Sequence, residues 1–463
     1  MSATDYLAKY YRSLCHSIRI RCVYRWWYGA SVLHQKQHGM NRSQISNPTI
    51  KVVERLVQHG YQAFLVGGCV RDLLLQKAPK DFDVATNADP QSICRLFARA
   101  RMIGKRFHIV HIPFHGELIE VTTFRGHHEA AKTVDHATRL HHTDKMVKSV
   151  SGMHLRDNVY GSIREDAARR DFTVNALYYD PLSQQLFTFG SGLADLQTGV
   201  LKMIGDASMR YCEDPVRMLR ALRLSIKLGF TIDGKTLEPV HQLHGLLSEV
   251  SPGRLYEEFK KMFLRGDATA LFKQLLKYKL MHHFFPTIRC FSRPPLTESK
   301  TEKLHYRNFV LSALRSTDRR VQERKQVTPT LLCAVLLWPE LIKHTSAHQP
   351  WYTLPPAELS KISTAVFVEQ KRFMFIPRPL INRIRNIWLL QLRLIKPEHP
   401  ERLITHQDFR ISYNFLLLHE QALKGSTTTF GSWWTDYLEA GASKKRQMGA
   451  QLREVAAPQQ NLQ

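Results

Sequence analysis

Residues 64–84 constrain the fold of this chain more than any other stretch. Residues 64–66 (Phe-Leu-Val) form an apolar run typical of a buried strand, Gly67-Gly68 predict a tight turn, and residues 69–75 predict a short helix. This order directs backbone N–H groups and the positive end of a helix toward one point, which suits a phosphate. The stretch therefore predicts a phosphate-binding turn at the end of a strand.

Two aspartates, Asp81 and Asp83, come thirteen and fifteen residues after Gly68. If residues 81–85 form a strand, side chains i and i+2 share a face, so we expect both carboxylates to project together. Paired carboxylates repel unless a cation lies between them, and Mg²⁺ accepts carboxylate and phosphate oxygens together. Alone, a Gly-Gly turn or an Asp-x-Asp is more often a turn or a cap. Their conjunction in this order predicts metal-dependent nucleotidyl transfer.

The charge of the chain indicates what it binds. Its 463 residues carry 66 Lys and Arg against 40 Asp and Glu, a formal net charge of +26. This excess predicts a polyanionic partner, nucleic acid first and an anionic membrane surface second. No apolar run reaches the roughly 18 residues that a membrane helix needs. The length allows about two to four domains.

The cysteines and the N-terminal residues say less about the fold and the function than the charge does. Seven cysteines are scattered with no CxxC pair, so neither a zinc ribbon nor a disulfide scaffold is indicated, and a reducing compartment fits best. Residues 1–45 read as a basic N-terminal extension. A surface-binding amphipathic segment and a transit-like peptide are the alternatives for this extension.

The following residues predict a small mixed sheet with helices on one side. Helices are expected at 50–58 and at 90–99, the latter capped by Asp89. Strands are expected at 107–113 and 118–124.

Glu120, in the second of these strands, is either a third acid beside the aspartate pair or the exposed residue of an alternating strand. Residues 126–157 contain six histidines with no metal-ligand spacing and predict a mobile loop.

Two further blocks carry charged residues at helical spacing. Ser162 and Glu165 form a capping box for a helix through about residue 176, which places the triplet Arg-Arg-Asp of 169–171 in mid-helix. Such a triplet is either a surface ion-pair patch or, opposite a metal site, a group that holds a triphosphate and completes the acidic cluster.

The second block begins at Asp214, a predicted N-cap with Pro215 at the first helical position. Arg217, Arg220 and Arg223 then recur every three residues as a basic ridge, which is either solvated or functional.

Beyond residue 250 the chain reads as almost wholly helical, with dense basic residues at 304–325 and 371–393. Aromatic residues lie among them: Tyr306, Phe309, Phe373, Phe375 and Trp388. Basic helices with interleaved aromatics suit single-stranded RNA. Core aromatics beside a solvated basic face are an equally ordinary explanation.

With these blocks in view, the chain resembles the class II nucleotidyltransferase family shared by CCA-adding enzymes and bacterial poly(A) polymerases. The resemblance rests on Leu-Val-Gly-Gly-Cys-Val-Arg-Asp at 65–72, Lys-Asp-Phe-Asp at 80–83, Glu-Val-Thr-Thr-Phe-Arg at 120–125, Arg-Arg-Asp-Phe-Thr-Val-Asn at 169–175 and Glu-Asp-Pro-Val-Arg-Met-Leu-Arg at 213–220. Within the family it is more similar to the bacterial poly(A) polymerases, through Leu-Arg-Asp-Asn-Val-Tyr-Gly-Ser at 155–162 and Leu-Tyr-Tyr at 177–179.

The resemblance implies an α+β protein, with a small mixed-sheet nucleotidyltransferase head followed by an all-helical neck and body. The expected parts are the extension at 1–45, the catalytic head at 46–181, the neck with nucleotide-selecting and RNA-binding helices at 182–270, and a helical RNA-binding body at 271–463.

The resemblance also implies a role for each motif residue. Asp81 and Asp83 would hold two Mg²⁺ ions, and Asp171 matches the family's third acidic position, with Glu120 a candidate for the same cluster. The expected triphosphate ligands are Gly67, Gly68, Arg71 and Arg170. The expected base-selecting residues are Asp214, Arg217 and Arg220, since Asp accepts from an exocyclic amine and Arg donates to ring acceptors.

The implied activity is template-independent transfer of AMP from ATP to RNA 3′ ends, in RNA processing and turnover. The alternatives are a CCA-adding tRNA nucleotidyltransferase and a non-catalytic RNA-binding protein. The expected partners are ATP, the 3′ ends of mRNA and small RNAs, and RNA-decay proteins, for a monomer in the cytoplasm.

Overall fold

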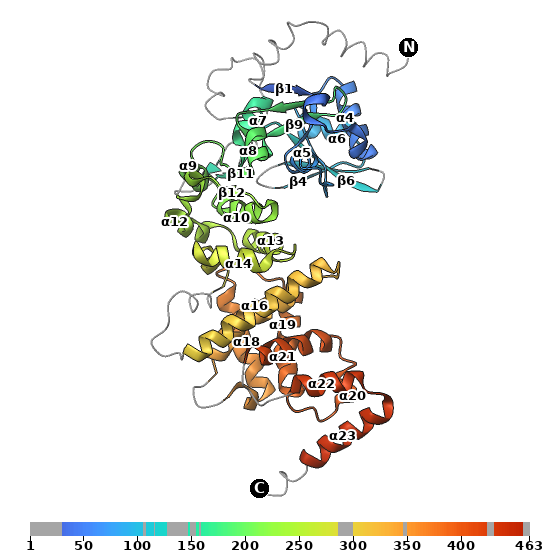
Figure 1. The fold of residues 1–463 in the computed structure, drawn as a ribbon, viewed down its shortest axis with the longest axis vertical. Helices are drawn as coiled ribbons and strands as arrows, with labels where there is room; N and C mark the ends of the chain where they lie inside the picture. The colour runs from blue at the N-terminus through green and yellow to red at the C-terminus, as the bar shows by residue number, and fades with distance from the viewer. Residues whose placement is uncertain are drawn as a thin grey trace. The chain divides into compact units, whose positions relative to one another are not determined.

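The structure is a computed structural model that describes residues 30–104, 108–114, 116–126, 147–148, 154–156, 159–285, 300–345, 350–423 and 430–456. Residues 1–29 of the expected extension and most of the predicted loop at 126–157 lie outside these ranges. The chain divides into two compact units, Met1–Leu243 and His244–Gln463 (Figure 1). Among the described residues, no helix is both long and apolar enough to span a membrane, and the four described cysteines are free.

An eight-stranded sheet forms the centre of the first unit, in the order β1-β10-β9-β2-β3-β6-β5-β4. Its strands are β1 (Ser31–His34), β2 (Ala63–Val66), β3 (Asp83–Thr86), β4 (Arg101–Ile103), β5 (Ile109–Phe114), β6 (Glu117–Thr123), β9 (Leu177–Asp180) and β10 (Gln185–Thr188). β3 and β6 run parallel and the other neighbouring pairs are antiparallel. The mixed sheet predicted from the sequence is therefore confirmed. Two short pairs lie apart from it: β7 (Val147–Lys148) with β8 (His154–Arg156), and β11 (Val200–Leu201) with β12 (Thr231–Ile232).

The sheet is wider than the predicted head at 46–181. β1 comes from the expected extension and pairs with β10, which follows the expected end of the head. Each of these four-residue strands is short, and only its long-range partner makes it a strand. β2, β9 and β10 are buried at every position, so both faces of this part of the sheet are covered, whereas β5 and β6 alternate between buried and more exposed residues.

The helices of the first unit follow the sequence patterns closely. They are α3 (Gln35–His38), η1 (Arg42–Gln44), α4 (Asn47–Gln58), α5 (Gly68–Leu74), α6 (Pro90–Leu96), α7 (Ile163–Arg169), η3 (Thr173–Asn175), α8 (Gly192–Thr198), α9 (Ala207–Glu213), α10 (Val216–Leu228), α11 (Gly234–Leu237) and α12 (Val240–Leu243). The predicted N-cap Asp89 accepts from Ser92 N, and the predicted capping box of Ser162 and Glu165 is present. However, α7 ends at Arg169 instead of near residue 176, so the Arg-Arg-Asp triplet lies at the end of a helix.

The second unit is helical throughout its described residues, as the sequence predicted. Its elements are η4 (His244–Glu249), α13 (Pro252–Phe263), α14 (Ala268–Lys277), η5 (Leu280–His283), α16 (Lys300–Gln322), α17 (Thr330–Lys343), η7 (Trp351–Thr353), α18 (Pro356–Gln370), α19 (Arg378–Leu394), α20 (Pro400–Leu403), α21 (Phe409–Ala422), α22 (Phe430–Glu439) and α23 (Ala442–Ala456). Helices α19, α21 and α22 lie together in Figure 1 and share a core that contains Leu394, Phe409 and Trp434.

The structure decides between the two explanations for the aromatic residues of this unit. Phe309 and Trp388 are buried, at 2% and 0% exposure. Trp388 donates its indole N–H to the Ala334 carbonyl, and Tyr306 donates its hydroxyl to the Leu336 carbonyl. Phe309 and Trp388 therefore belong to the core and do not offer their rings to RNA bases, whereas Tyr306 is half-buried. Phe375, at 44% exposure, is accessible.

A histidine enclosed in this aromatic core predicts acid sensitivity. The His419 ring on α21 lies 5.2 Å from the Phe309 ring and 5.8 Å from the Trp338 ring. Burial, together with the nearby His305, lowers the pKa of His419 from 6.5 to about 4. Because its folded pKa is depressed, the contribution of His419 to stability is complete above pH 6.5 and is lost as the pH falls toward 4.

We expect His419→Phe to remove part of this sensitivity. Wild-type protein should lose about 2 kcal/mol more unfolding free energy than the variant between pH 7.5 and pH 5. Urea unfolding of both proteins at the two pH values measures the difference. The same comparison between pH 7.5 and pH 8.5 should show none, and parallel curves down to pH 5 would contradict the prediction.

Candidate active site

Gly67 forms the turn between β2 and α5 in a conformation that favours glycine. Its φ is +77° and its ψ is −127°, a region that other residues rarely adopt. The Gly67 amide donates to the Leu177 carbonyl at 3.3 Å, which ties the turn to β9. A Cβ placed on Gly67 would lie 3.1 Å from Arg170 Nη1. The turn therefore passes directly beneath a guanidinium group.

The two predicted metal ligands do not share a strand face. Asp83 is the first residue of β3, whereas Asp81 precedes the strand. The Asp81 side chain is 68% exposed and lies 3.8 Å from Lys80 Nζ. Asp83 is held in the sheet and Asp81 lies at the surface beside it, which differs from the predicted arrangement.

Glu120 lies directly across from Asp83 and also occupies one of the more exposed positions of an alternating strand. Asp83 of β3 and Glu120 of β6 are register partners in the parallel pair. Burial raises the pKa of Asp83 from 3.8 to about 6, with further upward contributions from the charges of Glu120 and Asp81. On β5, His111 Nε2 lies 3.4 Å from Glu120 Oε1. Glu120 therefore belongs to the acidic group.

The chemistry of this donor set fits a divalent cation. Burial, and then the charges of Glu120 and Asp81, raise the pKa of Asp83 to about 6. A bound cation would relieve the repulsion between these carboxylates, and carboxylate oxygens are the ligands that Mg²⁺ takes. The residue types thus suit the metal that the family resemblance implies, but the ligand atoms of these three carboxylates do not all lie within 4.8 Å of one another.

Arg170 supplies the positive charge next to the acidic group. Its Nε donates to the Tyr178 hydroxyl at 2.9 Å, and its Nη2 donates to Asp166 Oδ2 at 3.0 Å. Burial alone would raise the pKa of Asp166, but Arg170 and Arg125 hold it below its ordinary value. Arg170 also lowers the pKa of Asp83. The guanidinium is therefore fixed on one side, with Nη1 directed over Gly67.

Arg71, predicted to bind triphosphate, faces protein groups. The residue is 4% exposed. Its Nε and Nη2 both donate to Asp72 Oδ1, and its Nη1 donates to Asn175 Oδ1 at 2.7 Å. Gly68 lies close by, since a Cβ on it would be 3.6 Å from Arg71 Nη2. These contacts favour a role for Arg71 in holding the turn.

Asp171, predicted as the third catalytic acid, is engaged on both oxygens. Arg220 donates to Oδ2 from Nε at 2.8 Å and also from Nη2. Oδ1 accepts from Asn175 Nδ2 at 3.0 Å and from the Phe172 amide at 2.8 Å. Burial opposes ionisation, but the Arg220 charge and these donors hold the pKa of Asp171 well below its usual range. The structure thus places Asp171 in an ion pair with α10.

Two arginines of the basic ridge of α10, Arg217 and Arg220, are paired with acids. Pro215 is the N-cap of α10, one position after the predicted N-cap Asp214, which is instead the C-cap of α9. Arg217 is 13% exposed in its side chain and donates from Nη1 to Glu213 Oε2 at 2.9 Å. Arg220 binds Asp171. Nη1 of Arg217 and both Nε and Nη2 of Arg220 are therefore held by acidic side chains.

Buried arginines accumulate around the end of α7. Burial lowers the pKa of Arg169 to about 10, and Arg125 and Arg210 contribute to the shift. Burial likewise lowers the pKa of Arg210 to about 10, with Arg217 contributing. Since the charged form is disfavoured at these positions, an anion bound nearby would stabilise it.

Sequence reasoning missed four residues that support this site: Asp166, Asn175, Tyr178 and Glu213. They orient Arg170, Arg71, Asp171 and Arg217 through the hydrogen bonds described above. Each of the four lies inside or beside a predicted motif, so its place in the sequence was the signal that could have identified it. Which side chain each would contact was not readable from spacing.

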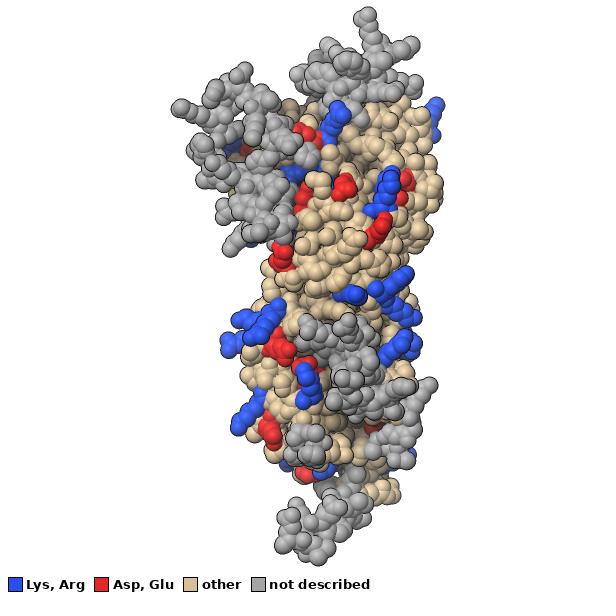
Figure 2. Space-filling view, turned by 90° about the vertical axis from the view of Figure 1, so that its left-hand side faces the viewer, with Lys and Arg blue, Asp and Glu red and all other residues tan. Residues whose placement is uncertain are grey.

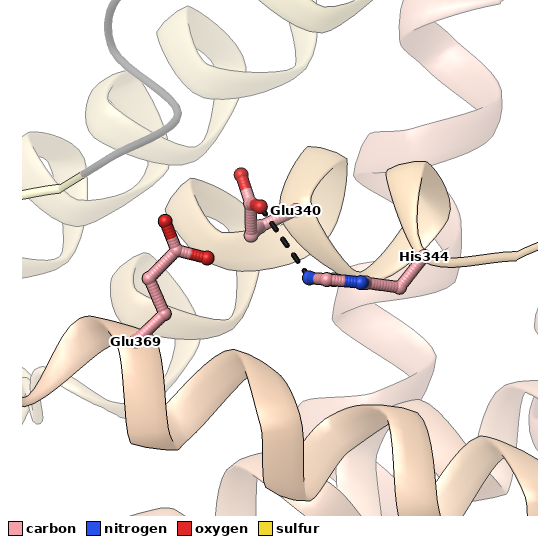
Figure 3. Close-up of side chains that lie close together, drawn as sticks. All are labelled: Glu340, His344 and Glu369. Atoms are coloured by element: carbon pink, nitrogen blue, oxygen red, sulfur yellow. Dashed lines mark ion pairs between the residues drawn. The ribbon is translucent and has the colours of Figure 1, made fainter.

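A second group of metal-ligand side chains lies in the second unit. Across the described parts of the chain, Glu340, His344 and Glu369 are the one set of three whose ligand atoms all lie within 4.8 Å of one another. Figure 3 shows Glu340 and His344 on one helix and Glu369 on another. Glu340 Oε1 already lies 3.2 Å from Lys343 Nζ and 3.5 Å from His344 Nε2. Glu340, the buried member of the set, is therefore already paired with residues that follow it in the chain.

Basic side chains are distributed over the surface. On the face that Figure 2 draws, Lys and Arg form several separate groups with acidic residues between them. No single continuous basic patch covers the described atoms of that face. The excess charge of the chain is therefore not concentrated at one point on this face.

Comparisons with known proteins show which family the chain resembles. Family models match three parts of the chain: "Poly A polymerase head domain" at 63–202, "Probable RNA and SrmB- binding site of polymerase A" at 229–291, and "Polymerase A arginine-rich C-terminus" at 355–462. In the solved structure of the Bacillus stearothermophilus CCA-adding enzyme in complex with CTP, the match covers 89% of this chain and 82% of that chain, at 22% identity and a TM-score of 0.52. This likeness shows a shared fold.

Two relatives are closer in sequence. The CCA-adding enzyme of Lactobacillus delbrueckii is 34% identical over 236 residues, which cover 50% of this chain and 54% of that enzyme. Poly(A) polymerase I of Salmonella typhimurium is 37% identical over 432 residues, which cover 92% of this chain and 90% of that enzyme. Since this match runs along nearly the whole of both chains, the chain belongs to the bacterial poly(A) polymerase family of class II nucleotidyltransferases.

Proposed function

We propose that this protein transfers AMP from ATP to the 3′-hydroxyl of RNA without a template. The observation that carries the proposal is the acidic group of Asp83, Glu120 and Asp81 beside Arg170, whose Nη1 lies over the Gly67 turn. The near full-length relatives named poly(A) polymerase I support ATP and RNA as the substrates.

The reaction replaces a phosphoanhydride bond of ATP with a phosphodiester bond. The 3′-oxygen of the RNA forms a bond to the α-phosphorus of ATP, the bond to pyrophosphate breaks, and the hydroxyl proton is released. When bound, Mg²⁺ would lower the pKa of the attacking hydroxyl and neutralise the leaving pyrophosphate, with two ions as the proposed number. Asp81, Asp83 and Glu120 would hold it. Arg170 and the backbone of Gly67 and Gly68 would bind the triphosphate.

Arg71 and Asp171 take supporting roles in this proposal. Arg71 braces the turn through Asp72 and Asn175, and Asp171 anchors α10 through Arg220. This assignment replaces the expected triphosphate and catalytic roles of these two residues, because their polar atoms are already engaged with protein groups.

Base choice is assigned to the start of α10. Glu213 holds Arg217 so that its remaining donors keep one direction, and Asp214 is the neighbouring acceptor. An acceptor and a donor at fixed positions match the exocyclic amine and a ring nitrogen of adenine.

The proposed head includes β1 and β10, and the neck and the helical body that follow would bind the RNA.

A CCA-adding activity is the second candidate, because a CCA-adding enzyme matches half of this chain at 34% identity. Incubation of an oligo(A) primer, or of tRNA lacking CCA, with ATP alone or with CTP separates the two. We expect the oligo(A) primer to be extended with ATP and to gain little from CTP. Efficient CTP addition to the tRNA without extension of oligo(A) would overturn the proposal. Absence of any Mg²⁺-dependent incorporation would leave a binding protein.

A further inference from the structure

Asn175 lies between two charged side chains that belong to different parts of the site. Its Oδ1 accepts from Arg71 Nη1 at 2.7 Å, and its Nδ2 donates to Asp171 Oδ1 at 3.0 Å. Asn175 is 8% exposed, so loss of either contact would leave a buried charged group short of a partner. The residue ends the 3-10 turn η3.

The neighbours dictate which way the amide points. A guanidinium only donates and an ionised carboxylate only accepts, so the amide oxygen must face Arg71 and the nitrogen must face Asp171. An aspartate at this position would keep the contact with Arg71 but could not donate to Asp171. A leucine would fill a similar volume and make neither hydrogen bond.

The contacts continue on both sides until they reach two helices. Arg71 of α5 donates to Asp72 at 2.8 Å, and Asp171 accepts from Arg220 of α10 at 2.8 Å. The route from the phosphate turn to α10 thus passes through the Asn175 amide.

A second contact joins the same two helices. Lys227 Nζ, near the end of α10, lies 3.7 Å from Asp72 Oδ2, and its side chain is 53% exposed. The Asp72 side chain is 15% exposed, but a 3.7 Å contact with a half-exposed lysine contributes little. The buried route through Asn175 is therefore the stronger constraint on the position of α10 relative to α5.

We propose that Asn175 is a positioning residue that sets the place of the base-selecting helix α10 relative to the Gly67-Gly68 turn. The inference rests on the proposed function, since it assumes that α10 chooses the base. It predicts that a change at Asn175 alters the choice between ATP and CTP, although Asn175 itself lies behind the residues proposed to contact the nucleotide.

The test compares Asn175→Asp and Asn175→Leu with wild type. We expect kcat/KM for ATP to fall about tenfold to a hundredfold, as small misplacements of reacting groups do. The ratio of ATP to CTP use should fall toward that of Arg217→Ala, the reference for lost base recognition. Isothermal titration with ATP and CTP, at a temperature at which circular dichroism shows each variant folded, measures the same preference by binding alone.

Thr173→Val is the matched control. Thr173 lies on the same turn and donates a buried hydrogen bond to Asp195 Oδ2 at 2.6 Å, outside the chain of contacts through Asn175. It should lose stability but keep the ATP to CTP ratio. If both Asn175 variants are folded and keep the wild-type ratio in binding, the inference is wrong. A wild type that binds ATP selectively but incorporates nothing would sink the proposed activity, and the binding comparison would still decide the role of Asn175.

Discussion

Asp83→Asn should reduce AMP incorporation by about 10³-fold or more while RNA affinity stays near wild type. The substitution keeps the shape of the side chain but removes the charge of a residue proposed to hold Mg²⁺, and metal stabilisation of the transition state is worth several kcal/mol. Primer extension with ATP and a filter-binding assay with the same RNA measure the two quantities. Retained affinity with lost incorporation would separate the catalytic proposal from a binding-only protein.

The same variant should be more stable than wild type when metal is chelated. Asp83 has a folded pKa raised from 3.8 to about 6, so its ionisation above pH 6 destabilises the folded state. Removal of the charge should add about 2–3 kcal/mol of unfolding free energy at pH 7.5. The gain should vanish toward pH 4, where Asp83 is protonated in the folded chain and partly protonated in the unfolded chain. Activity and stability thus move in opposite directions.

Asp89→Asn is the control for Asp83→Asn. Asp89 caps α6 through the Ser92 amide at 2.8 Å, and asparagine caps a helix about as well as aspartate does. This variant should keep full incorporation. If Asp83→Asn lost both activity and stability, a folding defect would explain it. If it remained active, Asp83 would not be a ligand.

Gly67→Ala should lower incorporation about 100-fold. The backbone at Gly67, with a φ of +77°, strains any residue that carries a Cβ, at about 1–3 kcal/mol. The new methyl group would also lie 3.1 Å from Arg170 Nη1 and displace the guanidinium or the turn. Steady-state kinetics should show the loss, and thermal unfolding should show the strain.

Gly60→Ala separates backbone strain from displacement of the site. Gly60 has a φ of +84°, and a Cβ on it would meet nothing within 4 Å. Both variants should therefore lose stability, but only Gly67→Ala should lose activity. Equal activity of the two variants would mean that the approach of Arg170 to the turn is not needed for the reaction.

The sequence predicted local structure well wherever a short-range signal exists. The strand, glycines and helix of residues 63–74, the Asp89 cap and the Ser162–Glu165 capping box are all present, because each depends on residues within one turn of each other. The end of α7 was placed too late, since apolar residues continue the helical pattern after Arg169 but belong to η3 and β9.

The sequence did not predict the contacts between residues that lie far apart in the chain. Residues 31–34 lack any strong strand signal and become β1 only through β10, more than 150 residues later. Arg71 and Asp171 belong to the predicted motifs, but which atoms they meet depends on Asn175 and Arg220. Motif spacing reports which residues belong to a site and does not report which of them face the ligand.

The sequence by itself determined the family, the order of the site motifs and the turn that places Gly67 after a buried strand, because these follow from local pattern and residue type. The tertiary structure alone decided that Glu120 is the partner of Asp83 and that Asp171 pairs with α10. The reason is physical: strand register and burial set which charges share a low-dielectric site, and neither is encoded at any single position.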